Sequence, residues 1–116
     1  MKIVQMNSTG APNVLQLLEV SEPIPAEGEV LVEVAYAGLN FADVMMRKGS
    51  YPAQISYPHT LGFEVSGIVT AHGQGISEPA LGTPVVALLI HGGYAEYVTA
   101  PAASVTPIPA GLDLAK

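Results

Sequence analysis

A short stretch in the first half of the chain brings an amide, a carboxylate and a phenol close together. Asn40, Asp43 and Tyr51 fall within a dozen residues of one another. An amide and a phenol can each donate a hydrogen bond to an oxygen that gains negative charge during a reaction. The residues alone favour a structural interpretation, because Asn40 suits a helix N-cap and Asp43 occupies the acidic position of a capping box. These residues therefore either cap a helix or line a cleft.

The residues after Asn40 predict a short helix that would hold this group in place. Phe41, Val44 and Met45 recur at a spacing that puts them on one helix face. Cations at positions 47–48 suit the last turn, where the helix dipole favours positive charge, and Gly49 suits a left-handed stop. A helix this short is unstable alone, so we expect it to pack against a sheet.

The rest of the chain reads as short strands joined by turns, which its ten Pro and twelve Gly favour. The clearest strand covers residues 29–38, where apolar and other side chains alternate. Further strands are expected at 2–5, 14–20, 61–73, 83–90 and 94–100. The 83–90 strand is apolar on both faces, which predicts a central strand. Gly62 and Gly67 predict bulges or close backbone contacts.

These elements predict one barrel-like domain that covers residues 1–116. Residues 101–111 are expected to be extended, and the final residues from Leu112 to Lys116 resemble the beginning of a helix.

Composition excludes several functions. With a net charge of −6 and only four Lys plus Arg, the chain lacks the cationic surface that nucleic acids or anionic membranes require. It has no cysteine, so it has neither disulfides nor thiolate metal ligands, which suits the reducing cytoplasm.

Other catalytic or binding motifs are weak. His59, His72 and His91 are too irregularly spaced to predict a metal site, although His59 lies close enough to the suspected site to contact a substrate. Paired glycines at 73/75 and 92/93 lack the third glycine and the following helix that a pyrophosphate site needs. The serines lack a nucleophile-elbow context, and a Ser-His-Asp triad stays open without any motif that indicates one.

Four segments in order resemble one known family. These are "GAPNVLQLLEV", "EVLVEVAYAGLNFADVMMRKGSYP", "LGFEVSGIVTAHG" and "GGYAEYVTAP". Together they resemble the N-terminal, GroES-like domain of zinc-independent quinone oxidoreductases in the medium-chain dehydrogenase/reductase superfamily. The resemblance implies a mainly β fold, a partly open GroES-like barrel with one or two short helices.

The resemblance also implies that no zinc is bound. Zinc-using alcohol dehydrogenases of the superfamily have a Cys at the position of Asn40 and a His at that of Phe63. An amide and a phenyl ring do not replace a thiolate and an imidazole as zinc ligands.

In the resembled family, NADPH reduces a quinone or an α,β-unsaturated carbonyl by hydride transfer. By this resemblance, Asn40 and Tyr51 are the expected catalytic donors, and Asn40 and Asp43 the expected cofactor contacts. Asp43 itself cannot stabilise an oxyanion while ionised, so its expected role is to orient Asn40 or to cap the helix. The substrate pocket is expected to include Tyr57, Phe63 and Leu89.

The family's cofactor domain, a Rossmann fold, is absent from these 116 residues. We therefore expect a fragment that folds but is inactive alone. Its intact parent is expected to be cytoplasmic, and its oligomeric state stays open, with a homodimer, common in the resembled family, as one alternative. Two alternatives stay open: an enoyl-thioester reductase domain of a larger synthase, and a free-standing GroES-like binding module without catalysis.

Overall fold

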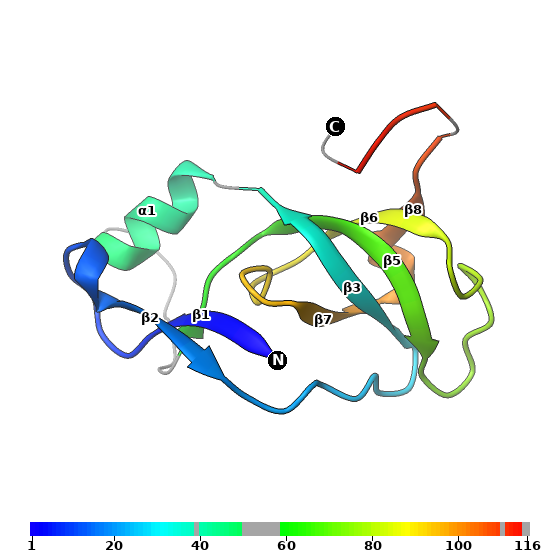
Figure 1. Cartoon of the computed structure of the whole chain (residues 1–116), viewed down its shortest axis with the longest axis horizontal. Coiled ribbons are helices and arrows are strands. Elements are labelled where there is room, and N and C mark those ends of the chain that lie inside the picture. The colour runs from blue at the N-terminus through cyan, green and yellow to red at the C-terminus, as the bar shows by residue number, and fades with distance from the viewer. Residues whose placement is uncertain (39, 50–58, 110, 115–116) are drawn as a thin grey trace.

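The computed structural model describes residues 1–38, 40–49, 59–109 and 111–114. Within these ranges the chain forms eight strands, one α-helix and two short 3₁₀ helices (Figure 1). The strands are β1 (Lys2–Met6), β2 (Leu15–Glu19), β3 (Glu29–Ala37), β4 (His59–Thr60), β5 (Glu64–His72), β6 (Pro84–Leu88), β7 (Tyr97–Pro101) and β8 (Val105–Pro107). The helices are η1 (Pro12–Val14), α1 (Phe41–Lys48) and η2 (Ala102–Ser104).

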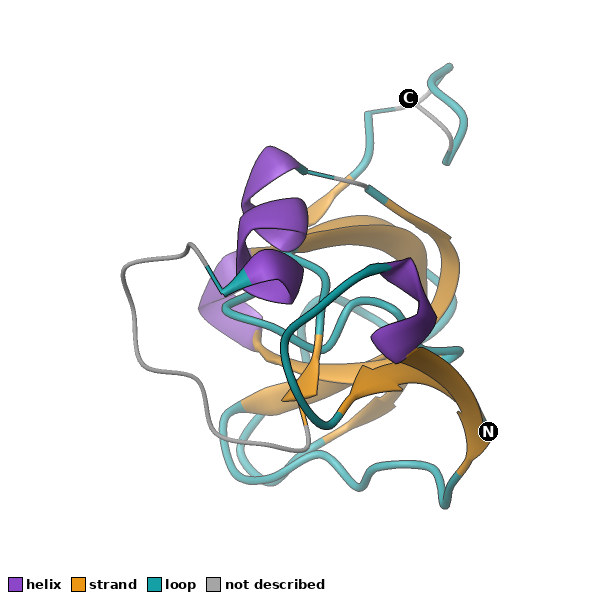
Figure 2. Cartoon of the chain, turned by 90° about the vertical axis from the view of Figure 1, so that its left-hand side faces the viewer, coloured by secondary structure: helices purple, strands orange, loops and turns teal. Residues whose placement is uncertain are grey.

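The strands form two antiparallel sheets. The smaller sheet has the order β2-β1-β4 and the larger has the order β7-β3-β5-β6-β8. An isolated bridge between Ile3 and Ala95 connects the smaller sheet to the segment before β7. The larger sheet curls strongly, and α1 lies to one side of it, above β1 and β2 (Figures 1 and 2). This arrangement confirms the prediction of a mainly β, partly open barrel with few short helices.

The core of the larger sheet consists mainly of valines, as expected for a chain with few aromatic residues. Nine buried residues form it: Val30, Val32, Val65, Val69, Val85, Ala87, Val98, Ala100 and Val105. A second, smaller core contains Met6, Met46 and Leu61, and it joins α1 to the smaller sheet. The predicted packing of the short helix against a sheet is thereby confirmed.

Gly67 is a close-contact point, as predicted. A Cβ atom there would lie 2.0 Å from the carbonyl oxygen of Glu33 on the neighbouring strand. The register of β3 against β5 shifts nearby, between Val34 and Tyr36, so that Ala35 is an extra residue opposite the Gly67–Ser66 step. The bulge bends the end of β3 toward the segment that precedes α1.

Two predictions about elements differ from the structure. Strand β4 lies in a segment that reads as a proline-containing loop, and two residues are too few for an alternation pattern. Residues Leu112–Leu114 are not helical, because a single turn makes too few helical hydrogen bonds to offset nucleation, and positions 115–116 lie outside the described residues. Strand β6 lies inside its sheet, between β5 and β8, which confirms the predicted central strand, although Val86 and Leu88 are 39% and 67% exposed. Among the described residues, no helix has the length and apolar character needed to cross a bilayer.

Candidate functional site

The site begins where α1 begins. Asn40 is the N-cap, with extended backbone angles, and its backbone N–H donates to the Asp43 carboxylate at 3.0 Å. At the other end, Gly49 adopts a left-handed conformation with φ 83°, and its N–H reaches the Met45 and Met46 carbonyls. The capping interpretation of Asn40 and Asp43 and the predicted glycine stop are therefore both confirmed. The helix presents its positive dipole end beside the Asn40 side chain.

Asp43 joins three separate segments of the chain. Its side chain is only 3% exposed, and both carboxylate oxygens accept hydrogen bonds. Oδ2 accepts from the Asn40 N–H at 3.0 Å and from the Tyr94 hydroxyl at 2.8 Å, and Oδ1 accepts from the Gly62 N–H at 3.2 Å. Asp43 thus links the start of α1, the turn before β5 and the segment before β7.

The Asn40 side chain differs from that of Asp43, because its amide nitrogen has no hydrogen-bond partner within the part of the chain that the structure describes. This atom, Asn40 Nδ2, is nevertheless buried. A buried donor without an acceptor costs about 1–3 kcal/mol, so such groups in native proteins need an explanation. The nitrogen is the donor that the sequence indicated for a carbonyl or anionic oxygen.

Tyr94 belongs to the site, although sequence reasoning assigned it only to a strand. Its ring packs against the smaller core, and its hydroxyl donates to Asp43. Burial raises the pKa of the Tyr94 hydroxyl, and the hydrogen bond to Asp43 raises it further, so the hydroxyl stays protonated and acts as a donor. Nothing in the sequence indicates this pairing, because the two residues are 51 positions apart.

The predicted substrate-pocket residues are only partly brought together. Phe63 packs against the smaller core, whereas Leu89 packs against the larger one. A backbone hydrogen bond of 2.7 Å from the Leu89 N–H to the Phe63 carbonyl connects them. Leu89 also lines a pocket of about 520 Å³ with Leu88, Ile90 and His91. The two tyrosines proposed for the site, Tyr51 and Tyr57, lie outside the described residues.

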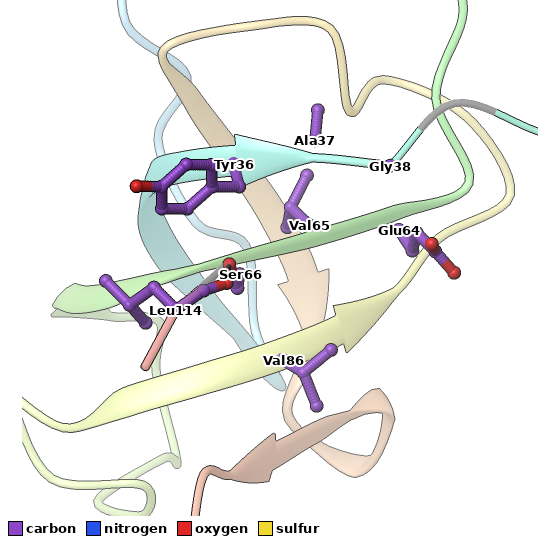
Figure 3. Close-up of a pocket in the computed structure, with 8 residues that line it drawn as sticks. All are labelled: Tyr36, Ala37, Gly38, Glu64, Val65, Ser66, Val86 and Leu114. Carbon is purple, nitrogen blue, oxygen red and sulfur yellow. Dashed lines mark hydrogen bonds between the residues drawn. The ribbon is translucent and has the colours of Figure 1, made fainter. Parts of the chain in front are cut away.

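A second pocket adjoins the segment that leads into α1 (Figure 3). It has a volume of about 270 Å³, and Tyr36, Gly38, Glu64, Ser66, Val86 and Leu114 are among its lining residues. Tyr36, Ser66 and Val86 face one another in register across three strands, and the Ser66 hydroxyl donates to the Leu114 carbonyl. The Tyr36 side chain is 56% exposed and that of Val86 39%, so this outer sheet face is open.

His59 lies near enough to Asp43 to be affected by its charge. Its ring centroid is 5.2 Å from that of His91, and its buried Nε2 atom has no hydrogen-bond partner among the described residues. Burial and the neighbouring His91 lower the pKa of His59, while the Asp43 charge acts in the opposite direction. Among the described residues, no three His, Asp or Glu side chains are grouped so that they could hold a metal ion.

The fold and motifs identify the family. Residues 26–110 match the alcohol dehydrogenase GroES-like domain, so the chain belongs to that family. A quinone oxidoreductase from Lama guanicoe is 36% identical over the whole of this chain, which covers 36% of that relative. The chain therefore spans about a third of the length of this curated relative.

Solved structures show the same relationship. The crystal structure of human synaptic vesicle membrane protein VAT-1 homolog-like protein matches 98% of this chain, and 37% of its own length, with a TM-score of 0.95 and 34% identity. Quinone oxidoreductase of Escherichia coli, complexed with NADPH, matches 98% of this chain and 35% of its own, with a TM-score of 0.92 and 33% identity. The predicted resemblance to the GroES-like domain of quinone oxidoreductases is thus confirmed.

Proposed function

We propose that this chain is the substrate-side domain of a zinc-independent, NADPH-dependent oxidoreductase that reduces quinones or α,β-unsaturated carbonyls. The relatives support the oxidoreductase class, since one is named quinone oxidoreductase and another was solved with NADPH. The absence of cysteine supports a zinc-free site and suits a cytoplasmic protein.

The observation that carries the proposal is the buried, unpartnered Nδ2 of Asn40 at the start of α1. A donor in this position fits a carbonyl oxygen, either of a nicotinamide carboxamide or of a substrate. NADPH, when bound, would supply a hydride, whose addition places negative charge on the carbonyl oxygen of the substrate. Hydrogen-bond donors already in position stabilise that charge most effectively, because they do not reorganise during the reaction.

Each residue has a separate task in this proposal. Asn40 donates to the oxygen, and Tyr51 is proposed as the second donor. Asp43 contributes no hydrogen bond to the oxygen, because an ionised carboxylate only accepts, and here it accepts from three groups of the protein. Its task is to fix the helix start that carries Asn40.

The rest of the active enzyme is proposed to be a Rossmann cofactor domain that follows this domain. The relatives are about three times longer than this chain, which supports additional structure. The exposed apolar face of Tyr36, Val86 and Leu88 also supports a covering partner, because isolated soluble domains rarely expose connected apolar patches. The 116-residue chain alone should therefore oxidise NADPH no faster than a buffer blank.

The test uses the longer protein that carries this chain, assayed with NADPH and a quinone. Asn40→Ser keeps an N-cap oxygen but removes the amide donor, so turnover should fall about 100-fold while the protein stays folded. Asn7→Ser, at an exposed asparagine, is the matched control and should leave turnover unchanged. Unchanged turnover in Asn40→Ser would refute the role of Asn40.

Tyr51→Phe in the same protein tests the second donor. We expect lower turnover and nearly unchanged NADPH affinity, because only the hydroxyl is lost. A turnover equal to that of the parent would remove Tyr51 from the mechanism. A panel of quinones, enones and enoyl thioesters then separates the proposed function from a synthase reductase domain, and no reduction of any of them would favour a binding module.

A further inference from the structure

The Asp43 carboxylate is held from three sides, and the donors differ in kind. Two are backbone N–H groups, from Asn40 and Gly62, and the third is the Tyr94 hydroxyl. The Tyr94 contact is the shortest of the three, at 2.8 Å, and it uses the same oxygen as the Asn40 N–H. The tyrosine therefore acts directly on the oxygen that holds the helix start.

Tyr94 is itself anchored by its backbone. Its N–H donates to the Leu61 carbonyl at 2.9 Å, and its carbonyl accepts from the Val4 N–H at 2.9 Å. Next to it, Gly93 and Gly62 pack so closely that a Cβ on Gly62 would lie 2.6 Å from the Gly93 Cα. The hydroxyl is thus presented from a backbone that is fixed on two sides.

We propose that Tyr94 is a positioning residue. Through Asp43 it fixes the backbone of Asn40, so that the side-chain nitrogen of Asn40 can donate to the reacting carbonyl oxygen. This inference rests on the proposed function. Without the hydroxyl, Oδ2 keeps only the Asn40 N–H and Oδ1 only the Gly62 N–H, so the carboxylate is held less firmly about its last torsion angle. The Asn40 backbone then gains freedom, and its side-chain nitrogen moves with it. Small misplacements of a reacting group cost large factors in rate.

The test compares Tyr94→Phe with Tyr97→Phe. Both substitutions remove one hydroxyl that donates to a carboxylate and keep the ring, but the Tyr97 hydroxyl meets Glu33 at the exposed surface, at 3.1 Å. In the 116-residue chain, we expect hydrogen exchange of the Asn40 and Gly62 amides to accelerate about tenfold in Tyr94→Phe and to stay unchanged in Tyr97→Phe.

In the longer enzyme, Tyr94→Phe should lower kcat about tenfold, with KM for NADPH within about twofold of the parent. Tyr97→Phe should leave both constants unchanged. If Tyr94 only stabilised the fold, Tyr94→Phe would lower the melting temperature without lowering kcat at an unchanged KM. Thermal unfolding of both variants is therefore measured in parallel.

The results distinguish the positioning role of Tyr94 from the proposed function of the enzyme. Unchanged exchange at Asn40 and Gly62 would refute the link through Asp43 and leave the proposed function standing. Faster exchange with unchanged kcat would refute the positioning role alone. A parent enzyme that reduces no quinone or enone would refute the proposed function and with it the positioning role, while the exchange data would still show whether Tyr94 restrains the helix start.

Discussion

Replacing Asp43 by Asn tests the central arrangement of the site with almost no change in shape. The carboxylate accepts three hydrogen bonds, two on Oδ2 and one on Oδ1. The amide keeps one oxygen and turns the other position into a donor. If the oxygen takes the Oδ2 position, the Gly62 N–H faces an NH₂ group. If the oxygen takes the Oδ1 position, the NH₂ group faces both the Asn40 N–H and the Tyr94 hydroxyl. The hydroxyl can rotate to accept from it, but the Asn40 N–H loses its acceptor.

In either orientation one buried backbone N–H loses its acceptor. That loss costs about 1–3 kcal/mol, and the remaining bonds weaken because they no longer meet a charge. Together these effects lower the free energy of unfolding by about 3 kcal/mol. For a chain of this size, the melting temperature should fall by about 12 °C.

The assay is urea unfolding of the 116-residue chain, followed by circular dichroism. Glu33→Gln is the control, because its carboxylate also accepts from a tyrosine, Tyr97, but at the exposed surface. We expect that change to stay within about 0.5 kcal/mol. An Asp43→Asn variant as stable as Glu33→Gln would show that the three hydrogen bonds do not hold the domain together.

Two further predictions concern acid stability and backbone contact. Burial and His91 lower the pKa of His59 in the folded protein. Below the ordinary value of 6.5 the unfolded chain therefore binds a proton more readily than the folded one, and the free energy of unfolding falls as the pH falls. From about pH 7 to about pH 5 the parent should lose more stability than His59→Gln, and equal losses would contradict this. Gly62→Ala should cost about 3 kcal/mol or more, because φ is 115° and the new Cβ meets the Gly93 backbone at 2.6 Å. Gly75→Ala, also at positive φ but in open space, should cost about 1 kcal/mol, and similar losses on denaturant unfolding would show that the close contact is unimportant.

Much of the fold could be predicted because its signals are local. Asn40, Asp43 and Gly49 specify the two ends of α1 within ten positions of sequence, and the structure confirms each of them. Alternation over residues 29–38 predicted β3 almost to the residue. In these cases the side chains that determine the element belong to the element itself.

The parts that sequence reasoning missed depend on distant partners. Strand β4 exists because Thr60 and His59 pair with Gln5 and Met6, more than fifty residues earlier. The Tyr94 hydroxyl meets Asp43 only because the segment before β7 returns beside the turn at Gly62. The family motif contains Tyr94 but does not say which carboxylate it meets.

The apolar strand β6 shows a third kind of difference. Its sequence is apolar on both faces, yet the side chains of Val86 and Leu88 are 39% and 67% exposed. An apolar pattern along a strand therefore does not by itself predict that both of its faces are buried within the described residues.

The cap and the proposed site depend on each other at Asp43. A carboxylate next to a carbonyl oxygen that gains charge opposes the reaction, unless other groups compensate for its charge. Here three donors and the positive end of α1 surround it, while Asn40 Nδ2 remains without a partner. The helix start can therefore keep an acidic N3 residue for stability and still offer a donor to an oxygen. The two uses are compatible because Oδ2 accepts from the backbone N–H of Asn40 and from the Tyr94 hydroxyl. The helix start is thereby fixed, while the side-chain nitrogen of Asn40 is not used.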